Sequence, residues 1–354
     1  MTTYNTLILG ASYGSLLGTK LLLAGHSVTL VCTRATADLI NQAGTLVRMP
    51  AKGREGLVEI SSNGLPGKLK AQTPGEVNPD EYDLVVLGMQ EPQYASPDVR
   101  QLVERIIAAG KPCMAIMNMP PMPYLARIPG ITMEDLQSCY RNPEIWVDFE
   151  PGLVTLASPD PQAFRPPKEA KNILQVSLPT NFKVARFESD EHTAMLRDME
   201  KDIEAIRYQT GDGSVELPVK LKVFDSVFVP LAKWSMLLAG NYRCIGQDEM
   251  IPIKDAVHSD LDASRSIYDW VKQLCIELGA KEEDLVPFDK YANAAKGLAK
   301  PSSAARALAA GAQSIERVDC IVKRLAGLKD MHSETVDRIV DLVEYHLQKN
   351  RRQA

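Results

Sequence analysis

Residues 7–18 read LILGASYGSLLG, a short apolar run that stops at Gly10 and continues into a helical pattern of leucines. Glycines at such a turn let backbone N–H groups approach a pyrophosphate, and the following helix aims its positive end at that charge. The usual GxGxxG spacing is altered, because Gly14 comes one residue early and Ser15 stands in register. Either this is a tight turn without a ligand or, as we predict, a dinucleotide-binding loop whose cofactor-binding residues are Gly10, Ala11, Ser12, Tyr13, Gly14 and Ser15.

The residues that follow the second apolar run, 28–31, indicate which dinucleotide binds. Sites for NAD usually place Asp or Glu there for the ribose 2′-OH, whereas a 2′-phosphate requires hydroxyl and basic groups. The chain has Thr33 and Arg34 at this point and no acid before Asp38. Because Arg binds phosphate well, the sequence favours NADP over NAD, with Thr33 and Arg34 as ligands. The alternative is that Arg34 is a solvated loop arginine.

The order of the patterns predicts an α/β fold followed by helices. Short apolar runs separated by helical patterns are typical of buried strands in a parallel sheet. From about residue 215 helical patterns follow one another, the clearest at residues 262–278 with Gly279 as its stop. We predict a Rossmann-type doubly wound sheet and an all-helical C-terminal domain, divided as 1–212 and 213–354. The expected strands after the second are residues 57–60, 83–87, 113–117, 147–157 and 182–187.

Composition excludes several classes of protein. The chain has 354 residues, 45% of them hydrophobic and 24% charged, and a net charge of -5. That charge gives no reason to expect nucleic acid binding, and no apolar run is long enough to span a membrane. The start lacks the features of a secretory signal, so we expect a cytoplasmic protein. The six cysteines are scattered without a CxxC pair, so no zinc site is predicted and buried thiols are expected.

Several stretches, in order along the chain, resemble the ketopantoate reductase (2-dehydropantoate 2-reductase) family. YGSLLG and AGHSVTLV match its opening, and DLVVLGMQEPQ is similar to its "DLVLVxVKxxQ" stretch. CMAIMN resembles the strand before its "QNG" turn, and LAKW the helix with its catalytic lysine. PSS and SIERVD resemble its "SSMLQD…TEIDxxNG" region. The resemblance covers most of the chain and implies an active site between the two domains.

The resemblance also implies roles for individual residues. Lys233 would be the general acid that protonates the oxygen as hydride reaches the carbon, and an ammonium suits this role because it stabilises a developing alkoxide. Glu316 would balance and orient that ammonium. The remaining implied contacts are Gln90 and Asn118 with the cofactor, and Asn241, Ser302 and Ser303 with the substrate.

The residues themselves leave alternatives open. Lys233 stands in an otherwise apolar stretch, 228–240, where a lone charge needs a partner or a water-filled cleft. It could also be an ordinary solvated lysine. Asn241 follows a glycine and could end a helix. Glu316 competes with Asp319 for its role and could be a surface acid beside Arg317.

Departures from the family pattern bear on the substrate. Gln90 replaces a basic residue, and a proline-rich segment, residues 119–123, replaces the NG turn. Leu237 stands where the family has the middle amide of a Lys, Asn, Asn series that contacts substrate. A leucine would leave a pantoate hydroxyl unpaired, at a cost of roughly 1–3 kcal/mol. The sequence therefore predicts reduction of a different 2-oxo acid or related carbonyl compound.

Two other functions fit the sequence. An opine dehydrogenase-like enzyme would reduce the imine of an amino acid and a 2-oxo acid with a histidine paired to an acid, for which His258 and His332 are candidates. A regulatory protein that binds NADP without catalysis would explain the irregular glycine loop, Gln90 and Leu237. In each case the partner is a small molecule, and the apolar C-terminal helices suit a homodimer.

Overall fold

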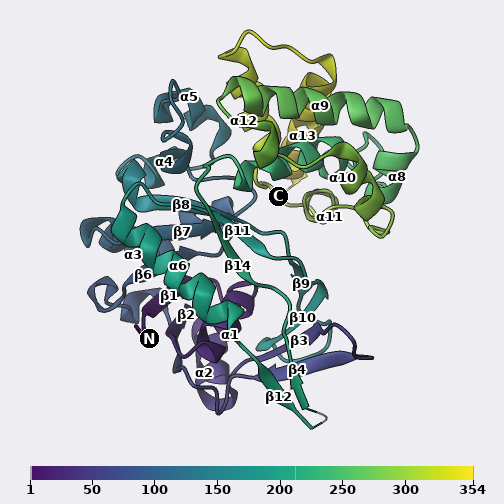
Figure 1. Ribbon diagram of the computed structural model, residues 1–354. Helices are drawn as coiled ribbons and strands as arrows, with labels where there is room; N and C mark the ends of the chain where they lie inside the picture. Colours follow the sequence, from purple (N-terminus) through teal and green to yellow (C-terminus); the bar gives the residue numbers. More distant parts are fainter. Residues whose placement is uncertain (1, 212, 354) are drawn as a thin grey trace. The chain divides into compact units, whose positions relative to one another are not determined.

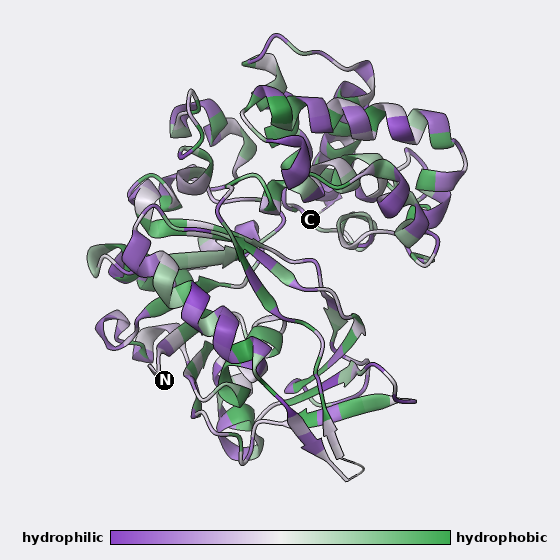
Figure 2. Ribbon diagram, viewed as in Figure 1, coloured by the Kyte–Doolittle hydropathy of each residue, from purple (hydrophilic) through white to green (hydrophobic). Residues whose placement is uncertain are grey.

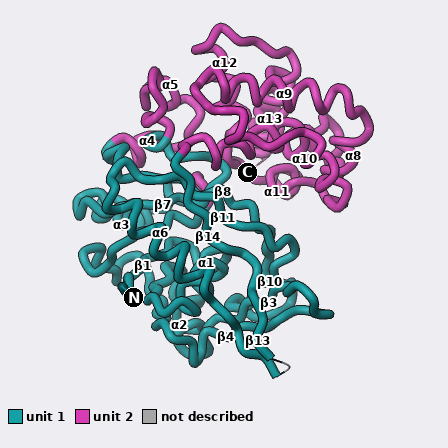
Figure 3. Tube along the Cα trace, viewed as in Figure 1, with its two compact units in different colours: residues 1–89, 93–124, 148–225 teal, residues 90–92, 125–147, 226–354 magenta. Residues whose placement is uncertain are grey.

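The computed structural model describes residues 2–211 and 213–353. The chain forms two compact units, coloured separately in Figure 3. Unit 1 contains most of the first 225 residues and unit 2 most of the rest, but two short segments, 90–92 and 125–147, leave unit 1 to join unit 2. The division expected from the sequence, at residues 212 and 213, treats each domain as one continuous stretch, whereas these units change after Asp225 and share the chain through both segments.

Unit 1 is built on an eight-stranded sheet with the order β14-β11-β8-β7-β6-β1-β2-β5 (Figure 1). Neighbouring strands are parallel except β8 and β11, which pair antiparallel. The central strands are apolar and buried along their whole length, as a sheet covered on both faces requires. This confirms the predicted Rossmann-type sheet, whose strands are β1 (Asn5–Leu9), β2 (Ser27–Val31), β5 (Leu69–Gln72), β6 (Leu84–Leu87), β7 (Cys113–Ile116), β8 (Val154–Ser158), β11 (Phe182–Ala185) and β14 (Leu221–Phe224).

Helices and a smaller sheet complete unit 1. Helix α1 contacts β1, β2 and α6, and α6 also contacts β14. Figure 2 shows α6 with alternating green and purple residues, in keeping with its buried Leu196, Met199 and Ile203. The helices are α1 (Gly14–Leu23), α2 (Arg34–Ala43), α3 (Pro97–Ala108), α6 (Asp190–Glu204) and α4 (Met122–Leu125), whose last residue belongs to unit 2. The second sheet has the order β4-β3-β10-β9, and a separate hairpin pairs β12 with β13. The bounds of these strands are β3 (Leu46–Pro50), β4 (Leu57–Ser61), β9 (Gln162–Phe164), β10 (Ile173–Leu178), β12 (Tyr208–Thr210) and β13 (Gly213–Val215).

Unit 2 is helical. Helix α9 has a buried face in which Ile267, Val271 and Leu274 lie in the core, as the sequence pattern predicts. Helices α12 and α13 pack against each other through apolar faces. The helices are α5 (Met133–Leu136), α7 (Lys233–Met236), α8 (Ile253–His258), α9 (Leu261–Glu277), α10 (Phe288–Ala295), α11 (Ser303–Ala309), α12 (Val318–Gly327) and α13 (Glu334–Gln353). Within the described residues, no helix is both long and apolar enough to cross a membrane.

Two parts of the chain differ from the sequence-based expectation. Residues 32–82, expected to be loops and short strands, contain α2 and a full edge strand, β5. Helix α2 is short and buries Thr36, Ala37 and Ile40, of which Ile40 alone has a large apolar side chain. Residues after 215 were expected to be helical, but β14 first completes the main sheet beside β11.

Candidate functional site

Gly10 shapes the loop that follows β1. Its φ of +103° is a left-handed conformation that side chains disfavour. A Cβ atom there would lie 2.8 Å from Met89 Cγ and 2.9 Å from the Gly88 carbonyl oxygen. The loop therefore passes against the end of β6 with no room for a side chain. This is the carboxyl edge of the parallel strands, where ligands bind in open α/β sheets.

Gly14 explains the irregular spacing of the glycines. A Cβ on Gly14 would lie 2.6 Å from Ile8 Cγ2, so only glycine lets the start of α1 approach β1 this closely. A Cβ atom on Gly18, one turn later, would lie 3.4 Å from Val28 Cγ1. Close helix–strand packing is the task of the third glycine in the usual fingerprint. Here Gly14 performs it one residue earlier.

The same loop leaves backbone amides available. Within residues 2–211 and 213–353, the N–H groups of Ala11, Ser12 and Tyr13 donate to no other backbone group. The Ser15 hydroxyl lies 2.5 Å from the Ala11 carbonyl oxygen and 2.9 Å from that of Ser12, so it can donate to either. Backbone N–H groups at the start of a helix can bind an anion when they have no other acceptor. The carbonyls beside these N–H groups already accept hydrogen bonds.

The Tyr13 side chain fixes this loop to the sheet. Its hydroxyl donates to the Pro161 carbonyl at 2.6 Å, and its ring meets Phe182 edge to face with centroids 5.9 Å apart. Burial raises the pKa of Tyr13. The ring thus has a structural role, and the backbone N–H is what Tyr13 offers to a ligand.

Arg34 is the first residue of α2, three residues after β2 ends, and it is paired with an acid that the sequence did not indicate. Its guanidinium donates to Glu76 Oε1 at 2.6 Å and lies 4.0 Å from Asp38. The Arg34 side chain is 60% exposed. Backbone and side-chain hydrogen bonds from Thr73, together with Arg34, lower the pKa of Glu76 to about 2. The carboxylate of Glu76 therefore stays charged at neutral pH.

The Thr33 hydroxyl lies 3.1 Å from the hydroxyl of Thr36.

Asn118 and Gln90 follow two central strands. Asn118 comes after β7, and its side-chain oxygen is buried without a hydrogen-bond partner in the described residues. A buried acceptor without a donor is costly unless a ligand or water supplies one.

Gln90 follows β6, is exposed, and belongs to unit 2. Its neighbour Glu91 is buried, and this burial raises the pKa of Glu91 to about 6 even though the Arg141 backbone N–H donates to it.

Lys233 begins an irregular helical stretch in unit 2. A 3₁₀ turn, Pro230–Ala232, precedes α7, and a π-helical turn, Leu237–Asn241, follows it. The Tyr242 N–H donates to the Leu237 carbonyl at 2.9 Å, a spacing of five residues. Such π turns are rare and frequent at functional sites. The wider turn rotates Asn241 away from the position that an unbroken α-helix would give it relative to Lys233.

The Ser302 side chain connects the π-helical turn to the start of α11. Its buried hydroxyl donates to the Asn241 carbonyl at 2.7 Å and accepts from the Ala305 N–H at 3.1 Å as the N-cap of α11. Ser303 is the first residue of α11 and is exposed. The structure thus brings Ser302 to Asn241, while the Ser302 side chain already has two partners.

Glu316 is buried and its backbone is held next to the same turn. The Tyr242 hydroxyl donates to the Glu316 carbonyl at 2.5 Å and accepts from the Val318 N–H at 3.0 Å. Arg317, the next residue along the chain, is paired with a buried acid. Its guanidinium lies 3.0 Å from Asp319. Asn241, Ser302 and the Glu316 backbone are therefore gathered around residues 241–242.

Sequence reasoning missed Glu76, Tyr242 and Glu91. Glu76 lies 42 residues from Arg34 along the chain, and the Tyr242 hydroxyl reaches a carbonyl 74 residues away. Glu91 gave one local signal, an acid directly after an apolar strand and Gln90. No cluster of three or more His, Cys, Asp or Glu side chains that could hold a metal occurs in the described residues.

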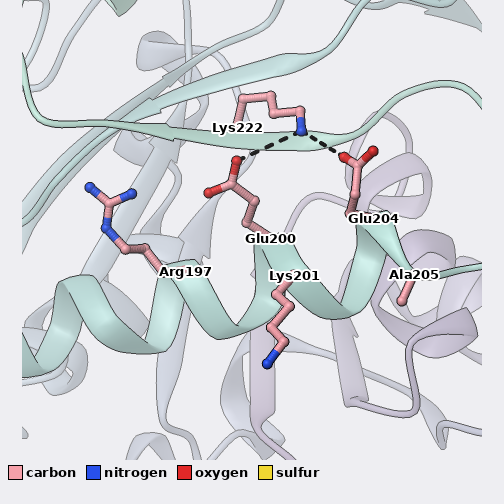
Figure 4. Close-up of a pocket in the computed structure, with 6 residues that line it drawn as sticks. All are labelled: Arg197, Glu200, Lys201, Glu204, Ala205 and Lys222. Atoms are coloured by element: carbon pink, nitrogen blue, oxygen red, sulfur yellow. Dashed lines mark hydrogen bonds and ion pairs between the residues drawn. The ribbon is translucent and has the colours of Figure 1, made fainter.

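A hollow beside α6 and β14 is lined by Arg197, Glu200, Lys201, Glu204, Ala205 and Lys222. Figure 4 shows Lys222 between Glu204 and Glu200, at 2.6 Å and 3.9 Å. Arg197 pairs with Asp225 at 2.7 Å. These cations already have carboxylate partners, so we do not take this hollow as the functional site.

Comparison with solved structures identifies the fold. No protein-family model matches the sequence, and no curated protein matches it either. A 2-dehydropantoate 2-reductase from Methylococcus capsulatus superposes with a TM-score of 0.66 at 13% identity, covering 98% of this chain and 97% of that one. A D-mandelate dehydrogenase, in a ternary structure with NADH and anilino(oxo)acetate, gives 0.63 at 13% identity, with 98% and 99% covered. A dimeric ketopantoate reductase from Staphylococcus aureus gives 0.59 at 10% identity, with 98% and 99% covered. The chain is similar in fold to these proteins over nearly its whole length.

Proposed function

We propose that the chain is an oxidoreductase, a divergent member of the ketopantoate reductase family that reduces a 2-oxo acid or related carbonyl compound with NADP(H). The observation that carries this proposal is the loop after β1, where Gly10 and Gly14 leave no room for side chains and three neighbouring amides are available. The fold, shared with reductases and with a dehydrogenase whose structure contains NADH, supports the same reading.

The cofactor would be held by groups of unit 1 and by Gln90 of unit 2. The amides of Ala11, Ser12 and Tyr13 suit the pyrophosphate, and Thr33 and Arg34 suit a 2′-phosphate. Asn118 offers its unpaired buried oxygen to a donor such as the carboxamide or ribose. The bound nicotinamide supplies a hydride. Gln90 would contact the cofactor from the segment that follows β6.

Lys233 would donate a proton to the carbonyl oxygen of the substrate. An ammonium both stabilises the negative charge that develops on this oxygen and can release a proton to it. Glu316 would orient the ammonium, and Asn241 would hydrogen-bond the substrate. Ser303, whose side chain is exposed, is a better ligand for a substrate carboxylate than Ser302, whose hydroxyl is already used twice. Leu237 favours a substrate more apolar than ketopantoate.

The proposal is tested by binding and turnover on the whole protein. We expect saturable binding of NADPH and NADH, and oxidation of NADPH with at least one member of a panel of 2-oxo acids with apolar side chains. Tight cofactor binding without turnover on any carbonyl compound would instead support a regulatory protein. We also propose a cytoplasmic homodimer, which native mass measurement in solution tests for its oligomeric state.

The histidines do not favour an opine dehydrogenase-like reaction. The His258 ring nitrogen contacts the Ala292 carbonyl at 2.9 Å. His332 lies 3.4 Å from Asp337 but is 74% exposed on the surface. We therefore expect His258→Ala and His332→Ala to retain turnover, and loss of turnover with cofactor binding intact in either variant would favour the imine reaction.

The ion pair of Arg34 and Glu76 leads to a prediction on cofactor preference. Glu76 neutralises Arg34 and would repel a 2′-phosphate, so Glu76→Gln should raise the preference for NADPH over NADH, by about threefold for an exposed pair. Arg34→Ala should lower the same ratio. Dissociation constants for both cofactors, measured by fluorescence titration, give the ratio directly. Equal shifts for NADPH and NADH, or a ratio unchanged in both variants, would place the ribose elsewhere.

A further inference from the structure

Two cysteines that are distant in sequence meet in unit 2. Cys320 lies in the first turn of α12, and Cys139 ends a 3₁₀ turn, Gln137–Cys139. Their Sγ atoms are 2.7 Å apart, although 181 residues separate them along the chain. Cys139 is buried, whereas Cys320 is half-buried.

The surroundings of the two thiols differ in a way that divides their roles. The thiol–thiol hydrogen bond with Cys139 and the positive charge of Arg317 lower the pKa of Cys320, while the pKa of Cys139 is raised. The start of a helix also favours a thiolate. Arg317 is itself fixed by Asp319 and by Glu344, at 3.0 Å each. The lower pKa of Cys320 and its greater exposure make it the more nucleophilic thiol of the two.

The other four cysteines have different surroundings. Cys113, Cys244 and Cys275 are buried, and burial raises the pKa of each. Cys32 is half-buried like Cys320, but burial raises its pKa to about 11. None of these four thiols contacts another cysteine within residues 2–211 and 213–353. Cys32 thus provides a matched control for accessibility without a partner.

We propose that Cys139 and Cys320 form an oxidation site, in which a hydroperoxide converts the two thiols into a reversible disulfide. The Cys320 thiolate attacks the peroxide oxygen, the O–O bond breaks, and the product is a sulfenic acid and water or an alcohol. The Cys139 sulfur then attacks the Cys320 sulfur, forming the S–S bond and releasing water. The two thiols lose two electrons and two protons in total, and the peroxide is reduced by the same two electrons.

The disulfide would join the turn at residues 137–139 to α12. That helix begins just after Glu316, whose carbonyl is held by the Tyr242 hydroxyl. A covalent link at Cys320 therefore restrains the segment that carries Glu316. The oxidation itself depends on the two thiols and on Arg317, and is independent of any activity as a reductase.

The test treats the full-length protein with hydrogen peroxide under denaturant-free conditions, then blocks free thiols and maps peptides without reduction. We expect the loss of two of the six free thiols, a cross-linked peptide containing Cys139 and Cys320, and recovery of both thiols with dithiothreitol. We also expect a higher midpoint of thermal unfolding after oxidation, since the link closes a long loop.

Variants separate this site from general oxidation. Cys32→Ser should react like the wild type, and Cys320→Ser should keep its remaining thiols reduced. Cys139→Ser should accumulate a sulfenic acid on Cys320 that a dimedone probe labels, because the second thiol is missing. Oxidation of Cys32 ahead of Cys320, disulfides only between separate chains, or no loss of thiols in the wild type would each overturn the proposal.

Discussion

Lys233→Ala should reduce the turnover of the carbonyl substrate by about 10²–10⁴-fold while NADPH binds with unchanged affinity. The reason is that a ketone oxygen gains negative charge as hydride reaches the carbon, and the alanine variant has neither the positive charge nor the proton to offer. The proposed nucleotide-binding groups other than Gln90 belong to unit 1, whereas Lys233 belongs to unit 2, so we expect cofactor affinity to be independent of this change. Steady-state kinetics and fluorescence titration give the two quantities separately.

Two further variants distinguish proton donation from charge alone. Lys233→Arg keeps the positive charge but holds its proton too tightly to release it, so we expect cofactor binding with little recovery of turnover. Lys290→Ala, at an exposed position of α10, is the control for removal of a lysine and should behave as the wild type. Turnover at the wild-type rate in Lys233→Ala, in a protein that binds NADPH normally, would rule out the proton-donor role.

The glycine loop shows which structural features can be predicted from the local sequence. The turn, the strand before it and the helix after it are visible in residues 7–18, because each depends on neighbours in the chain. The early position of Gly14 looked like a departure from the fingerprint. It is accounted for by the close approach of Ile8, whose Cγ2 lies 2.6 Å from where a Cβ on Gly14 would be. Recognising this requires knowledge of how α1 lies on β1.

Other features depend on residues that are far apart in sequence. The interpretation of Arg34 as a free phosphate ligand lacked Glu76, which reaches it from the turn after β5. Ser302 was expected to contact substrate, but whether a hydroxyl is free depends on its neighbours, here the Asn241 carbonyl and the Ala305 N–H. The π turn at Leu237 likewise breaks the i, i+4 spacing on which the comparison of Lys233 and Asn241 relied.

Lys20→Met should stabilise unit 1 at neutral pH. Lys20 lies in α1 and is 1% exposed. Its ammonium donates a hydrogen bond to the Pro218 carbonyl at 2.9 Å, and no carboxylate within the described residues forms an ion pair with it. Burial, with a smaller contribution from Lys220, lowers the pKa of Lys20 from 10.5 to about 7. A shift of this size corresponds to about 5 kcal/mol against the charged form. Methionine keeps the apolar stem but loses the hydrogen bond, which costs about 1–3 kcal/mol, so we expect a net gain of roughly 2–4 kcal/mol.

The pH dependence provides the decisive comparison, because its sign is fixed by the direction of the shift. Between pH 7 and 10.5 the unfolded chain binds a proton at Lys20 that the folded chain does not, so this residue makes the free energy of unfolding rise with pH. Below about pH 7 both states are protonated and the penalty is complete. Urea unfolding at several pH values should therefore show the advantage of Lys20→Met over wild type shrinking as pH rises from 7 to 10. Lys201→Met, a substitution at an exposed position of α6, is the control and should leave the free energy of unfolding unchanged. If the difference in free energy of unfolding between Lys20→Met and wild type stays constant across this pH range, the buried amine is not the titrating group.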